Sequence, residues 1–195
     1  MAHFTYEEKQ EIECMLLQKG KELFEEKGLK AVTVDILAKE IGIGKGTFYH
    51  FYRNKEHLFY AISNLIQRQV YKEIVEEKMD TKVYIPTDFV EEVLNLLFDK
   101  FMEHSILSQI KQVDYEIMAN KIPISYLQES TSIDGEILHF LKSKGIQFAY
   151  DENDIVSILQ LIFSQLSVIQ QVECDVKLIR IQLKAIAREM VLEAK

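Results

Sequence analysis

The chain has 195 residues, of which 48% are hydrophobic and 28% charged, and its formal net charge is −8 at pH 7. Seven glycines and two prolines are too few to punctuate a meander of short strands, so the composition favours an all-helical fold. No stretch approaches the ~18 uninterrupted apolar residues of a membrane span. The acidic opening MAHFTYEEKQ also lacks the order of a signal peptide, so we expect a cytoplasmic protein.

The first predicted helix spans Tyr6–Lys27 and ends at Gly28. Its inner side is expected to carry Ile12, Leu16, Leu23 and Phe24. Gly20 lies inside this helix, where glycine costs about 1 kcal/mol relative to alanine. That cost indicates a close crossing with another helix at Gly20.

Two short helices joined by a glycine turn come next. Thr33 has the position of an N-cap for a helix over Val34–Ile41, and Gly42 ends that helix. A second short helix is predicted over Lys45–Phe51. This pattern is typical of a helix-turn-helix, whose second helix enters the major groove of DNA.

The charge of the whole chain argues against nucleic-acid binding, because contacts to phosphate require positive charge. The acidic residues are unevenly placed, however, since residues 1–60 carry a net −1 and residues 61–195 carry −7. No acidic residue occurs between Gly42 and Lys55, a segment that contains Lys45 and Arg53. A local basic patch is therefore available in the predicted helix-turn-helix.

The remainder of the chain is also predicted to be helical. Asn54 caps a long helix that runs to about Glu77. Further helices are expected from Pro86 or Thr87 to Phe101, and over Ile106–Asn120, Ile133–Lys144, Asp151–Val172 and Val176–Leu192. The predicted fold class is all-α, with about nine helices: an N-terminal three-helix helix-turn-helix domain followed by a larger C-terminal helical domain.

A dense motif runs through the helix-turn-helix: Thr33-x3-Leu37-Ala38-x3-Gly42-Ile43-x-Lys45-Gly46-Thr47-Phe48-Tyr49, then Phe51-Tyr52-x2-Lys55-Glu56-x-Leu58-Phe59. Over about residues 12–60 it resembles the N-terminal signature of the tetracycline-repressor (TetR) family. The resemblance implies a DNA-binding domain over 1–54 and a ligand-binding and dimerisation domain over 55–195. It also implies a repressor that binds a palindromic, double-stranded DNA operator as a homodimer and is released by a small apolar or amphipathic effector.

The resemblance implies DNA-binding roles for eight residues: Thr33, Gly44, Lys45, Gly46, Thr47, Tyr49, His50 and Lys55. Tyr49 and Lys55 are expected to contact phosphate. Gly44 stands where many family members have Ser or Thr, so one hydroxyl that could bind phosphate is absent. Phe48 and Tyr52 are expected to be core residues that hold the recognition helix in place.

The last two predicted helices are apolar on more than one side, so one side can face the chain's own domain and the other a partner. The resemblance implies that these helices form a four-helix bundle between two subunits. The residues assigned to this interface are Ile155, Leu159, Ile162, Leu166, Ile169, Ile179, Leu183, Ile186 and Met190. Leu178 and Ile181 lie on a second apolar side, and the choice between the two sides stays open.

The helices between the DNA-binding domain and this interface would enclose a cavity for a small-molecule effector of unknown identity. Aromatic, methionine and polar side chains at helical spacing are the candidates for its wall. They are Phe101, His104, Tyr115, Met118, Tyr126, Phe140, Gln160 and Phe163.

No HExxH, GxSxG, Walker A or GxGxxG motif occurs, so neither a catalytic site nor a cofactor is predicted. Cys14 and Cys174 lack metal-site spacing and are interpreted as reduced thiols in the core. Glu136 and His139 form half of a di-iron motif without a second half, and we interpret them as a surface pair. The alternatives are an activator or corepressor-dependent regulator of the same fold, a helical di-iron oxidoreductase, and a structural oligomerisation module.

Overall fold

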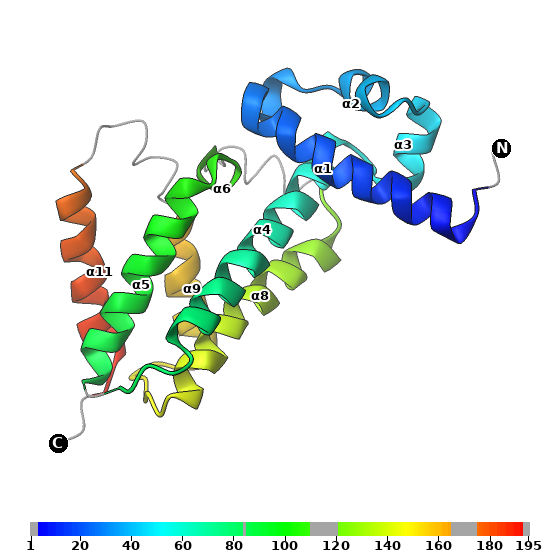
Figure 1. The fold of residues 1–195 in the computed structure, drawn as a ribbon. Coiled ribbons are helices and arrows are strands. Elements are labelled where there is room, and N and C mark those ends of the chain that lie inside the picture. Colours follow the sequence, from blue (N-terminus) through cyan, green and yellow to red (C-terminus); the bar gives the residue numbers. More distant parts are fainter. Residues whose placement is uncertain (1–3, 84, 110–120, 165–174, 193–195) are drawn as a thin grey trace.

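The computed structural model describes residues 4–83, 85–109, 121–164 and 175–192, without the side chains of 108–109, 124–132 and 163–164. These residues form helices with the following bounds: α1 Tyr6–Ala31, α2 Val34–Ile41, α3 Lys45–Phe51, α4 Lys55–Lys78, α5 Pro86–Glu103, α6 Ser105–Gln109, α8 Ile124–Ser143, α9 Glu152–Ser164 and α11 Val176–Met190. Figure 1 shows α1, α2 and α3 as a head at one end, from which α4 runs alongside α5 and α8 into the body. The all-helical prediction is confirmed for the described residues.

Local signals define the first helix. Thr5 and Glu8 form a capping box, in which each side chain accepts a hydrogen bond from the other residue's backbone N–H. The predicted end at Gly28 is confirmed as a break, because Gly28 has a φ of 75° and one further turn follows it. The inner side predicted for this helix is buried as expected, whereas Cys14 is exposed and the prediction that it lies in the core is wrong.

The close crossing predicted at Gly20 is present between α1 and α4. A Cβ atom at Gly20 would lie 3.0 Å from Ile62 Cδ1 and 3.1 Å from Leu58 Cδ2. These separations are tighter than ordinary van der Waals contact, so glycine lets the two helix axes approach. The crossing seats the head on the first half of α4.

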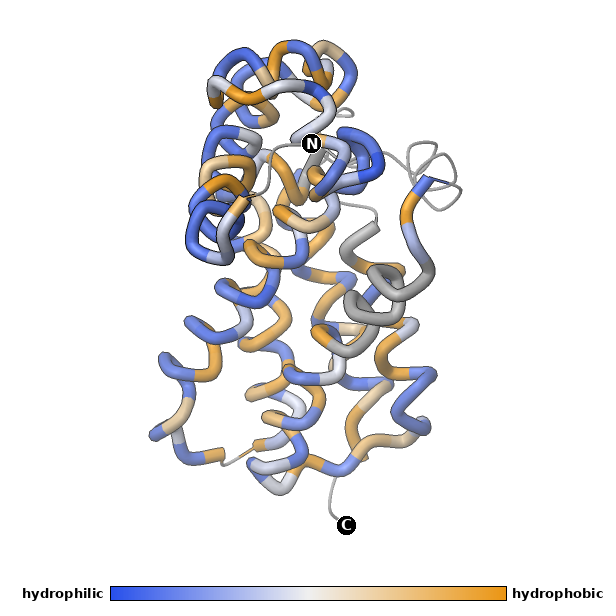
Figure 2. Tube along the Cα trace, turned by 90° about the vertical axis from the view of Figure 1, so that its right-hand side faces the viewer, coloured by the Kyte–Doolittle hydropathy of each residue, from blue (hydrophilic) through white to orange (hydrophobic). Residues whose placement is uncertain are grey.

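Aromatic and aliphatic side chains fill the space between α4, α5 and α8. The Tyr71 and Phe101 rings stack with centroids 6.0 Å apart, and Phe89 packs against Phe140 at 6.4 Å. Figure 2 shows the hydrophobic segments recurring along each helix, as expected for helices that bury one face. Among the described helices, none is both long and apolar enough to cross a membrane.

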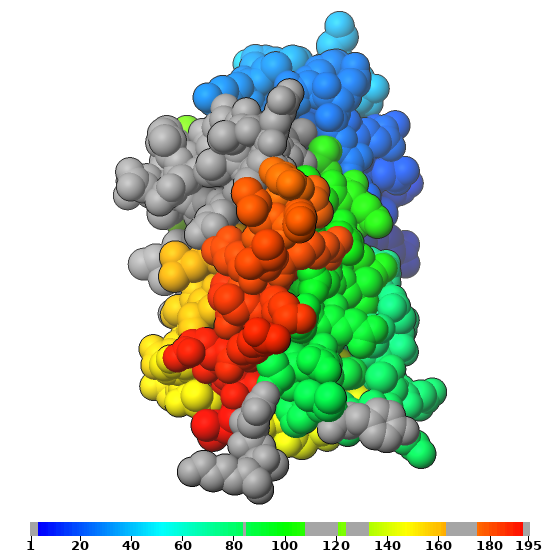
Figure 3. Space-filling model, turned by 90° about the vertical axis from the view of Figure 1, so that its left-hand side faces the viewer, coloured from blue at the N-terminus to red at the C-terminus, as the bar shows by residue number. Residues whose placement is uncertain are grey.

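The helix α11 lies on the outside of the body against α5, where Figure 3 shows it running across one face of the molecule. Arg180 fastens it there, since its guanidinium lies 2.5 Å from Asp99 Oδ1 and donates a 2.7 Å hydrogen bond to Asn95 Oδ1. At the end of α11, Val191 forms an isolated antiparallel bridge with Phe148. The last helix is thus held at both of its ends.

One predicted helix differs from the structure, and another is described only in part. The helix predicted over Ile133–Lys144 begins nine residues earlier, at Ile124. Pro123 is the N-cap residue of α8, a position that suits proline because it lacks only an N–H that a helix start leaves unpaired. The helix predicted over Ile106–Asn120 is described only as α6, because residues 110–120 lie outside the described part.

Candidate nucleic-acid interface

The turn between α2 and α3 has the geometry that its sequence predicts. Thr33 Oγ1 accepts a 3.3 Å hydrogen bond from Ile36 N and thereby caps α2. Gly42 ends that helix in the left-handed region, with φ 77° and ψ 26°, which glycine adopts without steric cost. Ile43 N then donates a 2.9 Å hydrogen bond back to Ala38 O. The chain therefore reverses in a few residues, and α3 is held against α2.

At the start of α3, two glycines leave the backbone uncovered by side chains. Gly44 is its N-cap, with no side-chain capping bond, and the Gly44 carbonyl accepts from Thr47 N at 2.9 Å. A Cβ atom at either Gly44 or Gly46 would have open space around it. The first N–H groups of a helix point toward its positive dipole end, so this bare start suits a phosphate group.

The recognition helix α3 divides into a buried side and an exposed side. Phe48 and Tyr52 are buried in the head, as predicted. Tyr49 is 54% exposed, with its ring edge-on to Phe48 at 5.6 Å. His50 and Lys45 are exposed as well. Three side chains that can hydrogen-bond to DNA therefore lie on the outer part of the head.

An acidic residue that the sequence analysis overlooked lies beside this basic side. Lys45 Nζ is 2.5 Å from Asp35 Oδ1, and both side chains are more than half exposed. Asp35 belongs to the first turn of α2, ten residues before Lys45, so it falls outside the acid-free segment. The positive charge of the basic patch is therefore partly neutralised in the structure by an acid that lies outside the acid-free segment of the sequence.

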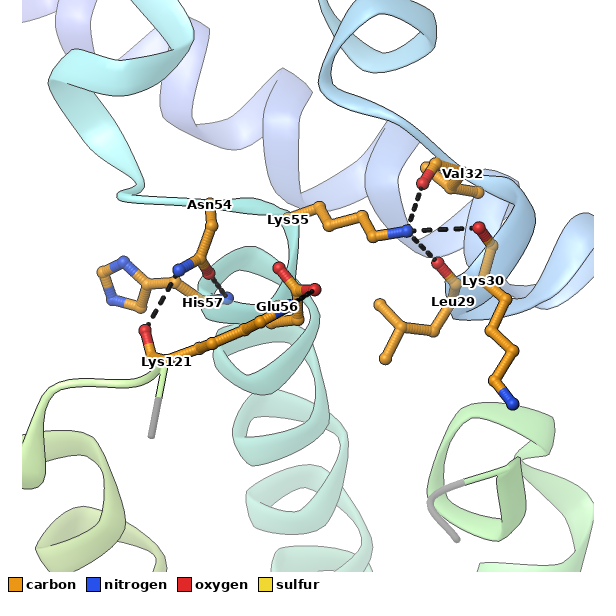
Figure 4. Close-up of polar contacts among 8 residues, drawn as sticks. All are labelled: Leu29, Lys30, Val32, Asn54, Lys55, Glu56, His57 and Lys121. Carbon is orange, nitrogen blue, oxygen red and sulfur yellow. Dashed lines mark hydrogen bonds and ion pairs between the residues drawn. The ribbon is translucent and has the colours of Figure 1, made fainter. Parts of the chain in front are cut away.

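The prediction that Lys55 neutralises a phosphate is corrected by the structure. Its Nζ donates to the backbone oxygens of Leu29, Lys30 and Val32 at 2.7, 3.2 and 2.7 Å, as Figure 4 shows. An ammonium group has three N–H donors, and all three are used here. These carbonyls end α1, where the helix dipole attracts a cation. Lys55 therefore joins α4 to the end of α1 and has no donor left for DNA.

His57, in the first turn of α4, is a buried neighbour of this contact. Its Nδ1 accepts a 3.2 Å hydrogen bond from Arg53 N, and its ring lies edge-on to Tyr52. Burial, and secondly the charge of Arg53, lower the pKa of His57 below its ordinary value. The neutral ring that results can keep accepting from Arg53, which helps to fix the link between α3 and α4.

The candidate wall residues of an effector cavity are only partly placed. Phe101 and Phe140 are buried in the body, and His104 is half-buried at the end of α5. Tyr115 and Met118 lie outside the described residues, as do the side chains of Tyr126 and Phe163. Gln160 is directed at Asp134, to which its Nε2 donates at 2.8 Å.

Asp134 is the centre of a buried polar cluster that the sequence analysis missed. The side chain is nearly fully buried, its Oδ1 accepts from Tyr71 Oη at 2.7 Å, and Gln67 Nε2 donates to the same oxygen. Burial raises the pKa of Asp134, against the opposing effect of these hydrogen bonds. The available signal was an aspartate that directly follows Ile133 and precedes Ile137 by three residues in a helical pattern. The cluster links α4, α8 and α9 through one carboxyl group.

The residues predicted to form a subunit interface are corrected in part. Six of them are buried in this chain's own core and offer no surface to a partner: Ile155, Leu159, Ile162, Ile179, Leu183 and Met190. Ile186 is half-buried, and Leu166 and Ile169 lie outside the described residues. The second apolar side predicted for the last helix is the exposed one, since Leu178 and Ile181 are 59% and 56% exposed.

Glu136 does not pair with His139. Its Oε1 lies 3.3 Å from an Arg68 guanidinium nitrogen, and both Glu136 and His139 are exposed. Within the described part of the chain, no three His, Cys, Asp or Glu residues form a group suited to a metal ion. The surface interpretation of Glu136 therefore stands, with a different partner.

A short α2, a left-handed glycine turn and an exposed α3 on a helical body define a helix-turn-helix protein. Residues 16–62 match the model of bacterial regulatory proteins of the tetR family. The chain is 30% identical over 132 residues to the HTH-type transcriptional regulator YhgD of Bacillus subtilis, a match that covers 67% of this chain and 65% of YhgD, just under two thirds of it. The helix-turn-helix of this chain is therefore similar to that of the TetR family, and the relative that it matches is a transcriptional regulator.

Solved structures agree in fold. A TetR transcriptional regulator from Rhodococcus sp. RHA1 superposes with a TM-score of 0.63 at 19% identity, over 93% of this chain and 96% of that one. The regulator FadR of Bacillus subtilis, solved in complex with stearoyl-CoA, gives a TM-score of 0.58 at 16% identity, over 89% and 96% of the two chains. At these identities the similarity shows a common fold.

Proposed function

We propose that this protein is a transcriptional repressor that binds a near-palindromic DNA operator as a homodimer and is released by a small molecule. The exposed side of α3 carries the proposal, because Lys45, Tyr49 and His50 project there above a bare helix start. We assign Thr33, Gly44, Gly46 and Thr47 to the same contact. Few of these side chains can distinguish base edges, so DNA shape supplies much of the specificity.

The homodimer is supported by the exposed apolar side of α11. Leu178 and Ile181 lie one turn apart on it, and Leu161 of α9 is 63% exposed. A second copy that covers these side chains would remove apolar area from water and place two heads on one DNA duplex. In such a dimer, the recognition helices should be roughly 34–36 Å apart, one turn of DNA.

The effector is proposed to be apolar or amphipathic. Aromatic side chains such as Phe101 and Phe140 are buried in the body, and one structural neighbour, FadR, was solved with stearoyl-CoA. Asp134 and Gln160 are the polar groups that could orient such a molecule. The division of labour would place DNA binding in residues 1–54 and effector binding in residues 55–195.

DNA binding is tested by selecting DNA from a random-sequence pool with the purified chain. The proposal expects enrichment of a palindromic site. Replacing Lys45→Met, Thr47→Ala and Tyr49→Phe together should weaken binding about 10–100-fold, since several phosphate contacts of about 1 kcal/mol each are lost. Lys142→Met, which removes an exposed lysine of α8 far from the head, is the matched control. Failure to enrich any site would refute the proposal.

The dimer is tested by sedimentation at several protein concentrations. Ile181→Glu places a charge on the exposed apolar side of α11 and should convert the dimer to a 22.8 kDa monomer. Gln182→Glu introduces the same side chain at the next position and should leave the mass unchanged. A wild-type chain that sediments as a monomer would contradict the dimer. An in vitro transcription assay on the selected site then distinguishes repression from activation.

A further inference from the structure

The first turn of α4 contacts both halves of the molecule through consecutive residues. Lys55 holds the end of α1 in the head through three backbone carbonyls. Its neighbours Asn54 and Glu56 turn the other way, toward Lys121, which lies just before α8 in the body. In Figure 4, Lys55 reaches the end of α1 on one side of this turn, Asn54 meets the Lys121 backbone on the other, and the Lys121 side chain runs across to Glu56.

Lys121 is bound at two points. Asn54 Nδ2 donates a 3.0 Å hydrogen bond to the Lys121 carbonyl, while Asn54 Oδ1 accepts from His57 N at 2.7 Å and caps α4. The Lys121 ammonium lies 2.6 Å from Glu56 Oε1. One asparagine side chain thus serves both the start of α4 and the segment that leads into α8.

The ion pair between Lys121 and Glu56 differs from an ordinary surface pair. The Glu56 side chain is only 11% exposed, whereas that of Lys121 is 45% exposed. A nearly buried carboxylate depends on its partner much more than an exposed one does, because it has lost most of its water. The next residue, Ile122, is buried, so the segment carrying Lys121 is anchored in the body.

Directional contacts matter here because the packing where α1 crosses α4 is apolar. Around Gly20, α1 packs on Leu58 and Ile62 of α4. Apolar packing resists separation of the helices but is not directional. Hydrogen bonds and a short ion pair restrict rotation as well, because they weaken steeply when their angles change.

We propose that Lys121 is a positioning residue that, through Glu56 and Asn54, sets the orientation of the recognition helix relative to the body. Lys55 links this turn to α1 through its hydrogen bonds, and Tyr52 and Arg53 link it to α3 through their contacts with His57. A displacement at the start of α8 therefore changes the angle of the head. The effect on DNA rests on the proposed function, whereas the orientation itself does not.

The DNA test uses the site selected by the wild-type chain, with its half-sites moved one or two base pairs closer or farther apart. Each base pair shifts a half-site by about 3.4 Å along the duplex and also rotates it, so a rigid dimer discriminates strongly between spacings. The wild-type chain should prefer its own spacing at least about tenfold. Lys121→Met should reduce this preference to about threefold or less, with unchanged affinity for an isolated half-site.

Two variants separate positioning from a general loss of stability. Lys121→Arg keeps the charge and should restore the wild-type spacing preference. Lys142→Met removes a comparably exposed lysine from an ion pair within the body and should leave the preference intact. A Lys121→Met chain that keeps the full preference would overturn the proposal.

A second measurement is independent of DNA. Spin labels at Lys39→Cys in the head and His139→Cys in the body, in a background of Cys14→Ser and Cys174→Ser, report the distance between the two parts. Lys121→Met should broaden the distance distribution, while Lys121→Arg and Lys142→Met should not. If the wild-type chain selects no DNA but Lys121→Met broadens this distribution, the proposed function fails and the positioning role stands. An unchanged distribution overturns the positioning role.

Discussion

Lys55 Nζ lies 2.7 Å from the backbone oxygen of Val32, across the junction between α4 and the end of α1. Leu29 and Lys30 supply two further acceptors to the same ammonium group. The positive charge of Lys55 is therefore compensated within the protein, by carbonyl groups that have no hydrogen-bond partner in the helix that they end. A lysine in a basic DNA-binding segment can thus be part of the scaffold that supports the interface.

Lys55→Met should destabilise the fold and leave the salt dependence of DNA binding unchanged. Hydrogen bonds from a charged donor contribute about 1.5–3 kcal/mol, and the methionine keeps the aliphatic volume without any donor. We expect a loss of that size in the free energy of unfolding, measured by urea titration followed by circular dichroism.

The salt dependence distinguishes this role from a contact to phosphate. Log affinity falls with log salt concentration, and each lost phosphate contact makes this slope less steep by about 0.9. Lys45→Met should produce such a change. If Lys55→Met does the same, with full stability, Lys55 binds DNA after all.

Asp35→Asn should strengthen DNA binding. The carboxylate lies 2.5 Å from Lys45 Nζ and faces the side that we assign to DNA, so it competes with phosphate for the lysine and repels the backbone. Exposed pairs contribute about 0.2–1 kcal/mol, so affinity for the selected site should rise about 1.4- to fivefold at low salt. The gain should fade as salt is added, because exposed charges are screened.

A matched control for Asp35 is Glu40→Gln, which removes an exposed carboxylate at the other end of α2. It should change affinity less than Asp35→Asn does. Equal gains from both variants would mean that net charge, rather than the contact with Lys45, limits binding.

The helix-turn-helix could be predicted from the sequence because its signals are local. Thr33 caps α2 by accepting from an N–H only three residues away, and Gly42 ends that helix through its own φ angle. The partners of Lys55 lie 23–26 residues earlier in the chain. Local patterns place that lysine at a helix start but do not say which carbonyls come within its reach.

The body was harder to predict for a different reason. A helix that is apolar on two sides has two candidates for its buried side, and periodicity alone does not choose between Ile179 and Ile181. Packing against α5 decides it, through Arg180 and its contacts to Asp99. Asp134 was missed because its partners Tyr71 and Gln160 come from helices distant in sequence.

Gly20→Val should lower the melting temperature. Its branched side chain would press on Leu58 and Ile62, which already stand 3.0–3.1 Å from a Cβ atom at that position. Overpacking of this kind costs about 1–3 kcal/mol, which is roughly 2–10 °C for a chain of this size. Gly135→Ala is the matched control, since a Cβ atom at Gly135 meets nothing within 4 Å. Gly135→Ala should raise the melting temperature. A Gly20→Val chain with an unchanged melting temperature would show that the two helices can move apart without cost.

Asp134→Asn should make the fold more stable at neutral pH and remove part of its pH dependence. Burial raises the pKa of Asp134 in the folded chain above its value of 3.8 in the unfolded chain. Between those two pKa values the folded state holds a proton that the unfolded state has released. Stability therefore falls as pH rises through this window and stays lower above it.

The asparagine side chain does not ionise, so the folded variant has no buried charge at this position at neutral pH. Its Oδ1 can accept from Tyr71, and its Nδ2 can donate to the Gln160 amide oxygen once that amide turns over. Urea unfolding between pH 4 and pH 8 should show the variant gaining on the wild-type chain as pH rises.

Glu152→Gln gives a control of opposite sign. The hydrogen bond from Lys142 lowers the pKa of Glu152, so that carboxylate stabilises the fold above pH 4.5, and its contribution is lost as the pH falls through the lowered value. The glutamine variant should therefore lose stability relative to the wild-type chain at neutral pH, by a small amount because the pair is exposed. For Asp134, parallel curves of unfolding free energy against pH in Asp134→Asn and the wild-type chain would mean that ionisation of the buried carboxyl does not destabilise the fold.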